Sequence, residues 1–194
     1  MIRIPDTAYI YRILSIDNGT TTMGIVVSDL NLRTGKIEVV YAETCNATVS
    51  SRRYQSIIEN MGDRFARYRT LALNLREVLD EYDVDVVIAE GAYSHLNLET
   101  FAILREALAV IRETVIEYDD RLELHVVPPT KVKKAVKAEN FQGKTAMRQA
   151  VLALRHITYL NGIDPEKLDE HCIDGIGVAE YLAIQTLNEV HRRK

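Results

Sequence analysis

The sequence predicts an α/β fold: a five-stranded mixed β-sheet, three antiparallel strands followed by parallel strands, flanked by helices. Two continuous apolar runs, over 12–18 and 84–90, contain a carboxylate at their end and are typical of buried strands. The segments 22–30 and 36–47 are rich in β-branched residues, and the turn-forming stretch 31–35 separates them. These observations predict an antiparallel meander of three strands beside a further buried strand.

After the meander, apolar residues recur at helical spacing between residues 54 and 82, which predicts one long amphipathic helix. They are Ile57, Ile58, Met61, Phe65, Tyr68, Leu71, Leu75 and Leu79. Asn97 is a typical N-cap residue and predicts a second helix that ends at about Tyr118.

The C-terminal part of the chain predicts one more strand and three helices. The strand spans 122–127, because the two prolines that follow it end a strand. Short helices are expected over 130–138 and 143–156, and a last helix over about 169–190. Strands that alternate with helices imply parallel strands joined by helical crossovers.

Length and composition limit the possible classes of protein. The 194 residues fit one domain over 1–194, with a core at about 12–187, a short N-terminal extension and a basic C-terminal tail. Cys45 and Cys172 are interpreted as small buried apolar residues, since their spacing fits no zinc site. The N-terminus does not resemble a signal peptide, and no apolar run approaches the roughly 18 residues of a membrane span. We therefore expect a soluble, cytoplasmic protein without a membrane partner.

The charge of the chain is unevenly distributed. A net charge of -4 argues mildly against a nucleic-acid partner, because most DNA-binding domains are basic. Between residues 131 and 155, however, Glu139 is the only acid. The basic residues of this segment are Lys131, Lys133, Lys134, Lys137, Lys144, Arg148 and Arg155. Such a segment suits the phosphate backbone of DNA, and the structural alternative is a solvated helical face.

Two acids end the predicted buried strands. Asp17 and Glu90 lie at the carboxyl ends of their strands, where ligands of open α/β sheets bind. Asp174 lies on an apolar stretch of the last predicted helix, where an unpaired carboxylate is costly. His171 precedes it by three residues and therefore shares its helix face. These four side chains are the candidate site.

The residue types of this site point to metal chemistry. Carboxylates with one imidazole suit Mg²⁺ or Mn²⁺. Two such ions, about 3.5–4 Å apart, activate water and stabilise the leaving oxygen in phosphodiester hydrolysis. Each acid also has a structural interpretation that needs no metal. In it, Asp17 is a residue that organises a turn, Glu90 a solvated strand end, and Asp174 the cap of a helix that begins later. Asp169 is a competing N-cap.

Gly175 and Gly177 follow the last candidate acid, Asp174. Each costs about 1 kcal/mol relative to alanine inside a helix. We therefore expect a close approach of the helix backbone to the sheet beside Asp174. A short disordered stretch before the helix is the alternative.

Four segments, in order, resemble the RuvC-type Holliday junction resolvases of the RNase H-like nuclease superfamily. They are Ile13-Leu-Ser-Ile-Asp17-Asn-Gly-Thr20, Ala89-Glu90-Gly-Ala-Tyr93, Thr130-Lys-Val-Lys133 with Gly143-Lys144-Thr145, and His171-Cys-Ile-Asp174-Gly-Ile-Gly-Val-Ala179. The resemblance implies an RNase H-like fold. It also implies an endonuclease that resolves four-way or other branched DNA junctions with paired symmetric nicks and divalent metal ions.

Position by position, the resemblance also implies residue roles. The catalytic and metal-binding residues would be Asp17, Glu90, His171 and Asp174. Tyr93 would lie against unpaired bases at the junction centre, where stacking contributes about 1–3 kcal/mol per base. The basic segment described above predicts the DNA-binding residues Lys131, Lys133, Lys134, Lys137, Lys144 and Arg148, and of these the resemblance supports Lys133 and Lys144, which match basic positions of the family.

The resemblance further implies a homodimer. A twofold axis supplies two sites for two opposed strands of a junction. The helix over 97–118 is apolar enough for a dimer seam, although burial within the monomer explains its pattern equally well.

The chain departs from the family at some positions. Asn18 stands where the family often has proline, and glycines at 175 and 177 stand where alanines are usual.

Two other functions are alternatives to the resolvase. The stretch 16–21 also resembles the phosphate loop of actin- and sugar-kinase-like ATPases, but those proteins need a second lobe and an adenosine-binding glycine pair. A non-catalytic DNA-binding protein on the same fold is the other alternative.

Overall fold

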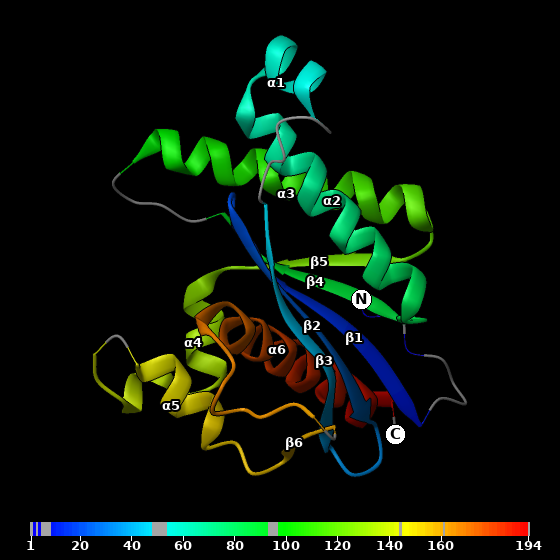
Figure 1. The fold of residues 1–194 in the computed structure, drawn as a ribbon. Helices are drawn as coiled ribbons and strands as arrows, with labels where there is room; N and C mark the ends of the chain where they lie inside the picture. The colour runs from blue at the N-terminus through cyan, green and yellow to red at the C-terminus, as the bar shows by residue number, and fades with distance from the viewer. Residues whose placement is uncertain are drawn as a thin grey trace.

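Three antiparallel strands form the centre of the sheet in the computed structural model, which describes residues 2, 4, 9–47, 54–92, 97–143, 145–160 and 162–193 (Figure 1). They are β1 (Ile10–Asp17), β2 (Thr22–Asn31) and β3 (Ile37–Asn46). β2 pairs antiparallel with both neighbours, and its register with β3 shifts at Val27/Ser28. The predicted meander is therefore confirmed.

Parallel strands extend the sheet on both sides. β4 (Val86–Glu90) pairs in parallel with β1, and β5 (Glu123–Val127) pairs in parallel with β4. The full order is β5-β4-β1-β2-β3-β6. The prediction of a mixed sheet flanked by helices is confirmed, but the sheet has six strands rather than five.

The additional strand is β6 (Ile157–Tyr159), which pairs in parallel with β3 at the sheet edge. The prediction of a helix over 143–156 was too long, because α5 (Ala146–Leu152) ends earlier. A strand of three residues has too few positions to show a period of two. Tertiary contacts fix it instead: His156, just before β6, places Nε2 2.9 Å from the buried Oε2 of Glu180.

Two helical layers cover the sheet (Figure 1). One face carries α2 (Asp63–Glu81) and α3 (Leu98–Tyr118). The other carries α4 (Pro129–Ala135), α5 and α6 (Glu170–Arg193). The first strand is a continuous apolar run because both of its faces are covered: Ile13 packs towards α6, whereas Leu14 and Ile16 pack towards α2 and α3.

The predicted long helix over 54–82 is broken. Gly62 has φ 87° and ψ 166° and separates α1 (Gln55–Met61) from α2. This backbone conformation favours glycine, and it redirects the chain although the apolar spacing continues across it. α1 buries no side chain, and Met61 and Phe65 on either side of the break are 64% and 42% exposed. The apolar periodicity of the sequence continues into α1, which lies outside the core, and so could not show where the helix leaves the core.

Other helix boundaries agree more closely with expectation. The Asn97 side chain accepts hydrogen bonds from the backbone N–H groups of Glu99 and Thr100, so the predicted N-cap of α3 is confirmed. The helix expected over 130–138 is α4 followed by the 3₁₀ turn η1 (Ala138–Asn140). Within the described ranges, no helix is long and apolar enough to cross a membrane.

The last helix approaches the sheet closely at Gly175. A Cβ atom there would lie 2.9 Å from Cγ2 of Val26 in β2. This confirms the predicted close approach beside Asp174. Gly177 faces elsewhere: its Cβ would meet Met147 of α5 and, at 3.3 Å, Val132 of α4.

We predict that Gly175→Ala destabilises the protein by about 1–3 kcal/mol, because overpacking outweighs the higher helix propensity of alanine. In a Val26→Ala background the nearest clash is gone, and the same change should be neutral or stabilising. Urea unfolding of the four proteins gives the coupling energy. Equal effects of Gly175→Ala in both backgrounds would contradict the close contact.

Candidate active site

Two acids lie side by side at one edge of the sheet. Asp17 is the last residue of β1 and Glu90 the last residue of β4, and these strands are parallel neighbours with Ile16 paired to Ala89. Parallel strands of matched register bring their carboxyl ends together. Asp17 is 8% exposed and Glu90 is half-buried.

Helix α6 brings the other two candidates to the same edge. Its first turn is capped by Asp169, whose Oδ1 accepts hydrogen bonds from the backbone N–H of Cys172 (3.0 Å) and from the hydroxyl of Thr44 (2.7 Å). The competing N-cap is therefore the correct one, and Asp174 lies inside the helix, one turn after His171.

A glycine in β2 lets α6 sit this close. Gly24 lies against the backbone carbonyl of His171, and a Cβ atom there would also be 3.1 Å from the His171 Cβ. Any side chain at this position would push the first turn of α6 away from the sheet. The site geometry thus depends on two glycines of different elements, Gly24 and Gly175.

His171 connects both ends of the loop between β1 and β2. Its Nδ1 lies 2.7 Å from Oδ2 of Asp17, and its Nε2 lies 3.0 Å from Oγ1 of Thr22. With Asp17 ionised, the Nδ1–H donates to the carboxylate and the ring is held in one orientation. Thr22 gave no signal in the sequence, since nothing in a run of three threonines marks which one faces the helix.

The acids are close enough to raise one another's pKa. Burial, together with the charges of Asp17 and Asp174, raises the pKa of Glu90 to about 8. Burial and the charge of Asp17 raise the pKa of Asp174 to about 6. Burial raises the pKa of Asp17 as well, although the hydrogen bond from His171 opposes this. Burial is the largest cause for all three acids, and the charge of Asp17 adds to it for Glu90 and Asp174.

Two positive side chains partly offset this repulsion. The ammonium of Lys133 in α4 lowers the pKa values of both Glu90 and Asp174 without outweighing burial. Burial lowers the pKa of His171, but the hydrogen bond and charge of Asp17 outweigh it and raise the pKa overall. One lysine and one histidine thus face three acids, and negative charge remains in excess.

The donor set fits a hard divalent cation, because its three carboxyl groups supply oxygen ligands. The geometry is not a finished ligand shell: among the described residues, no three His, Cys, Asp or Glu side chains are grouped tightly enough to hold a metal ion. His171 uses both ring nitrogens within the protein. The metal-binding role of the four residues remains a prediction.

The predicted DNA-binding lysines lie on the helical segment that follows β5. Those of the described part, Lys131, Lys133, Lys134 and Lys137, are all exposed. Lys137 has φ 59° and ends the α4 segment in a left-handed conformation. Tyr93 and Lys144 lie outside the described residues.

Arg148 differs from these lysines. Its guanidinium donates hydrogen bonds to the backbone carbonyls of Pro165 (3.3 Å), Glu166 (3.4 Å) and Leu168. This arginine joins α5 to the loop that leads into α6 and its site residues. Its N–H groups are thus used inside the protein, which sequence composition alone did not indicate.

Comparisons with known proteins identify the fold. Neither a protein-family model nor a curated protein sequence matches this chain. Solved structures do match. The RuvC of T. thermophilus in complex with a Holliday junction substrate has a TM-score of 0.69 at 16% identity, covering 92% of this chain and 96% of that one.

Two further structures agree. A second Thermus thermophilus RuvC structure has a TM-score of 0.66 at 15% identity, covering 93% of this chain and 96% of the other. The yeast mitochondrial Holliday junction resolvase has a TM-score of 0.62 at 13% identity, covering 94% of this chain and 82% of that one. The chain therefore has the fold of RuvC-type Holliday junction resolvases, as its ordered motifs predicted.

Proposed function

We propose that this protein is a metal-dependent endonuclease that recognises and cuts four-way or other branched DNA junctions. The observation that carries this proposal is the convergence of three acids, Asp17, Glu90 and Asp174, on one edge of the sheet. Burial raises the pKa of each, and the charge of Asp17 raises those of Glu90 and Asp174 further. A protein retains such a costly arrangement where a bound cation relieves it. The fold shared with junction resolvases supports the choice of substrate.

The four site residues would hold Mg²⁺ or Mn²⁺, and two ions would suit this number of oxygen ligands. When bound, such ions activate water and stabilise the leaving 3′ oxygen of a phosphodiester. The chain's own residues prepare the site. His171 orients the Asp17 carboxylate, and Lys133 offsets part of the negative charge next to Glu90 and Asp174.

The exposed lysines of α4, with Lys137 just after it, would contact the DNA backbone. Their helix begins directly after β5, whose end pairs with the end of β4 at Glu90. Lys131, Lys134 and Lys137 therefore continue a positive surface outward from the acid site. A duplex arm bound there would have one phosphate near the carboxylates, which fits a track of sequence-independent contacts.

Paired cuts on opposed strands require two copies of the site, so we propose a homodimer. Helix α3 offers a surface for it. Its core-facing residues, such as Leu108 and Ile111, are buried, whereas Ile116 on the outer side is 49% exposed. The outer side of α3 thus presents apolar area that the monomer does not use.

We expect symmetric paired nicks in a synthetic four-way junction with Mg²⁺, and none with EDTA or on a matched linear duplex. Asp17→Asn should reduce cutting by at least about 100-fold, because even residues that only orient metal ligands cost 10–100-fold. Its junction binding in Ca²⁺ should persist. Asp120→Asn, on the loop before β5, is the control. ATP turnover without nicking, or undiminished cutting by Asp17→Asn, would refute the proposal.

Lys134→Ala should weaken junction binding and reduce the slope of log K against log salt concentration by about 1, the share of one phosphate contact. Lys36→Ala is the matched control, since Lys36 lies at the turn between β2 and β3, at the other end of the sheet. Fluorescence anisotropy at several salt concentrations measures both slopes. An unchanged slope in Lys134→Ala would remove this lysine from the DNA surface.

Without metal, the raised carboxyl pKa values make stability depend on pH. The folded Glu90 holds its proton up to about pH 8, whereas the unfolded one loses it near 4.5. The native state then binds more protons, so the free energy of unfolding falls as pH rises from about 4.5 to 8. Mg²⁺ or Mn²⁺ should restore more stability at pH 8 than at pH 5.5.

Glu90→Gln isolates this contribution. The variant should show a flatter decline of melting temperature with pH and a smaller gain on addition of metal than the wild type. Calorimetry at several pH values, with and without Mn²⁺, gives both quantities. A wild type that loses no stability over this pH range would show that burial and the neighbouring acids do not raise the pKa of Glu90 in solution.

A further inference from the structure

The residue after Asp17 joins the acid site to helix α3. The Asn18 side chain donates from Nδ2 to the backbone carbonyl of Leu104, at 3.2 Å and across 86 positions of sequence. Its other polar atom, Oδ1, is buried and has no hydrogen-bond partner among the described residues. A buried amide with one bond made and one acceptor unused is a costly side chain. A specific reason for its presence is therefore required.

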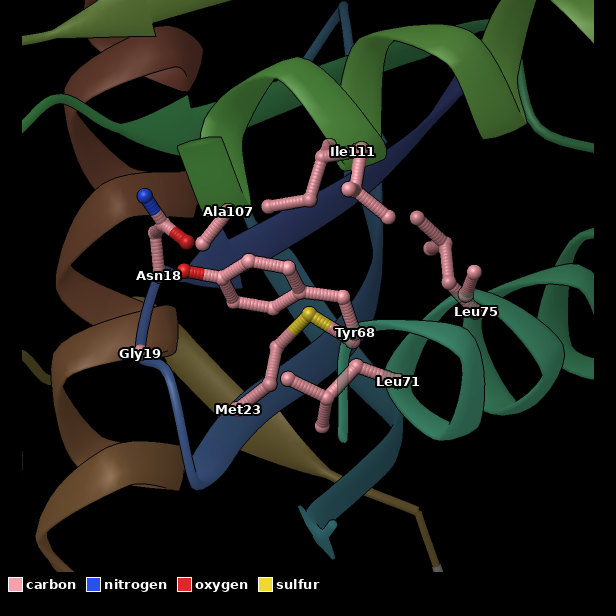
Figure 2. A pocket seen from close by; sticks show the side chains of 10 residues that line it. Asn18, Gly19, Met23, Tyr68, Leu71, Leu75, Ala107 and Ile111 are labelled. Carbon is pink, nitrogen blue, oxygen red and sulfur yellow. The ribbon is translucent and has the colours of Figure 1, made fainter. Parts of the chain in front are cut away.

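Asn18 lines a small apolar cavity between the β1–β2 loop, β2, α2 and α3 (Figure 2). Tyr68 reaches the same end of this cavity from α2, near Ala107 of α3 (Figure 2). Its hydroxyl donates to the carbonyl of Ile103 at 2.9 Å. Two consecutive carbonyls of α3 are thus held from opposite sides, one by α2 and one by the residue next to a site acid.

The other side of the loop cannot take up a displacement. Thr22 and Asp17 are both held by the ring of His171. Gly19 packs against the carbonyl of Thr22 so closely that a Cβ atom would not fit. A movement of α3 relative to the sheet would therefore act through Asn18 on the backbone of Asp17, rather than being lost in a flexible turn.

We propose that Asn18 is a positioning residue that sets the Asp17 carboxylate relative to α3. The consequence is that contacts on the outer side of α3 influence the alignment of the acid site. This inference rests on the proposed nuclease function. It assigns to Asn18 a role that neither its type nor its position gives by itself, and it predicts an effect on the rate of cutting rather than on DNA binding.

The test is Asn18→Leu, which keeps the branched shape but removes both polar atoms. We expect kcat for junction cutting to fall roughly 10- to 100-fold, the effect of a misplacement on the order of 1 Å. The half-saturating Mg²⁺ concentration should rise, and the junction Kd in Ca²⁺ should change less than about twofold. Stability to urea should not fall, because one hydrogen bond and one unsatisfied acceptor are lost together.

Tyr68→Phe is the matched control. It removes the other side-chain hydrogen bond to the same turn of α3, from a residue that is not next to a site acid. Its kcat, half-saturating Mg²⁺ concentration and Kd should equal those of the wild type. Asn18→Ala serves as a second, smaller variant and should repeat the loss of kcat if leucine proves too large for folding.

The outcomes separate the two claims. An unchanged kcat in both Asn18 variants, or an equal loss in Tyr68→Phe, would overturn the role of Asn18 and leave the nuclease function standing. A fall confined to Kd would also overturn it, because positioning acts on the reaction. A wild type that cuts no branched DNA would overturn the proposed function, and this inference with it.

Discussion

The hydrogen bond between His171 and Asp17 is the contact on which the site depends. It joins the end of the first strand to the first turn of the last helix, residues 154 positions apart. Both partners reach it only because the helix backbone lies almost against the sheet at Gly24 and Gly175. The close packing of the α6 backbone on the sheet is therefore what brings these two side chains within hydrogen-bond distance.

The electrostatics of the site follow from the same packing. Three carboxyl groups are drawn into one poorly solvated place, and of the exposed lysines of α4 it is Lys133 that acts on two of them. The chain as a whole is acidic, with a net charge of -4, so the basic surface of α4 arises from charge separation rather than from total charge. An acidic protein can thus present a basic surface beside an acidic centre.

Strand ends and caps were predictable because they depend on local patterns. The apolar runs ending at Asp17 and Glu90 and the N-cap at Asn97 are visible in a few consecutive residues. The break at Gly62 and the strand β6 were not, because a left-handed glycine and a three-residue edge strand leave no periodic signal. The partners of the site, Thr22 and Asn18 among them, depend on tertiary contacts and were invisible to sequence patterns.

The contacts of Arg148 have a consequence for how this chain tolerates change. The guanidinium holds the segment before α6 through three main-chain oxygens, those of Pro165, Glu166 and Leu168. Every amino acid supplies such an oxygen, so these contacts do not restrict the side chains at 165 and 166, whereas Leu168 also packs against the core. The arginine cannot be replaced by lysine, because lysine lacks the planar fork that reaches several carbonyls at once. Homologues should therefore vary at 165 and 166 while retaining the arginine.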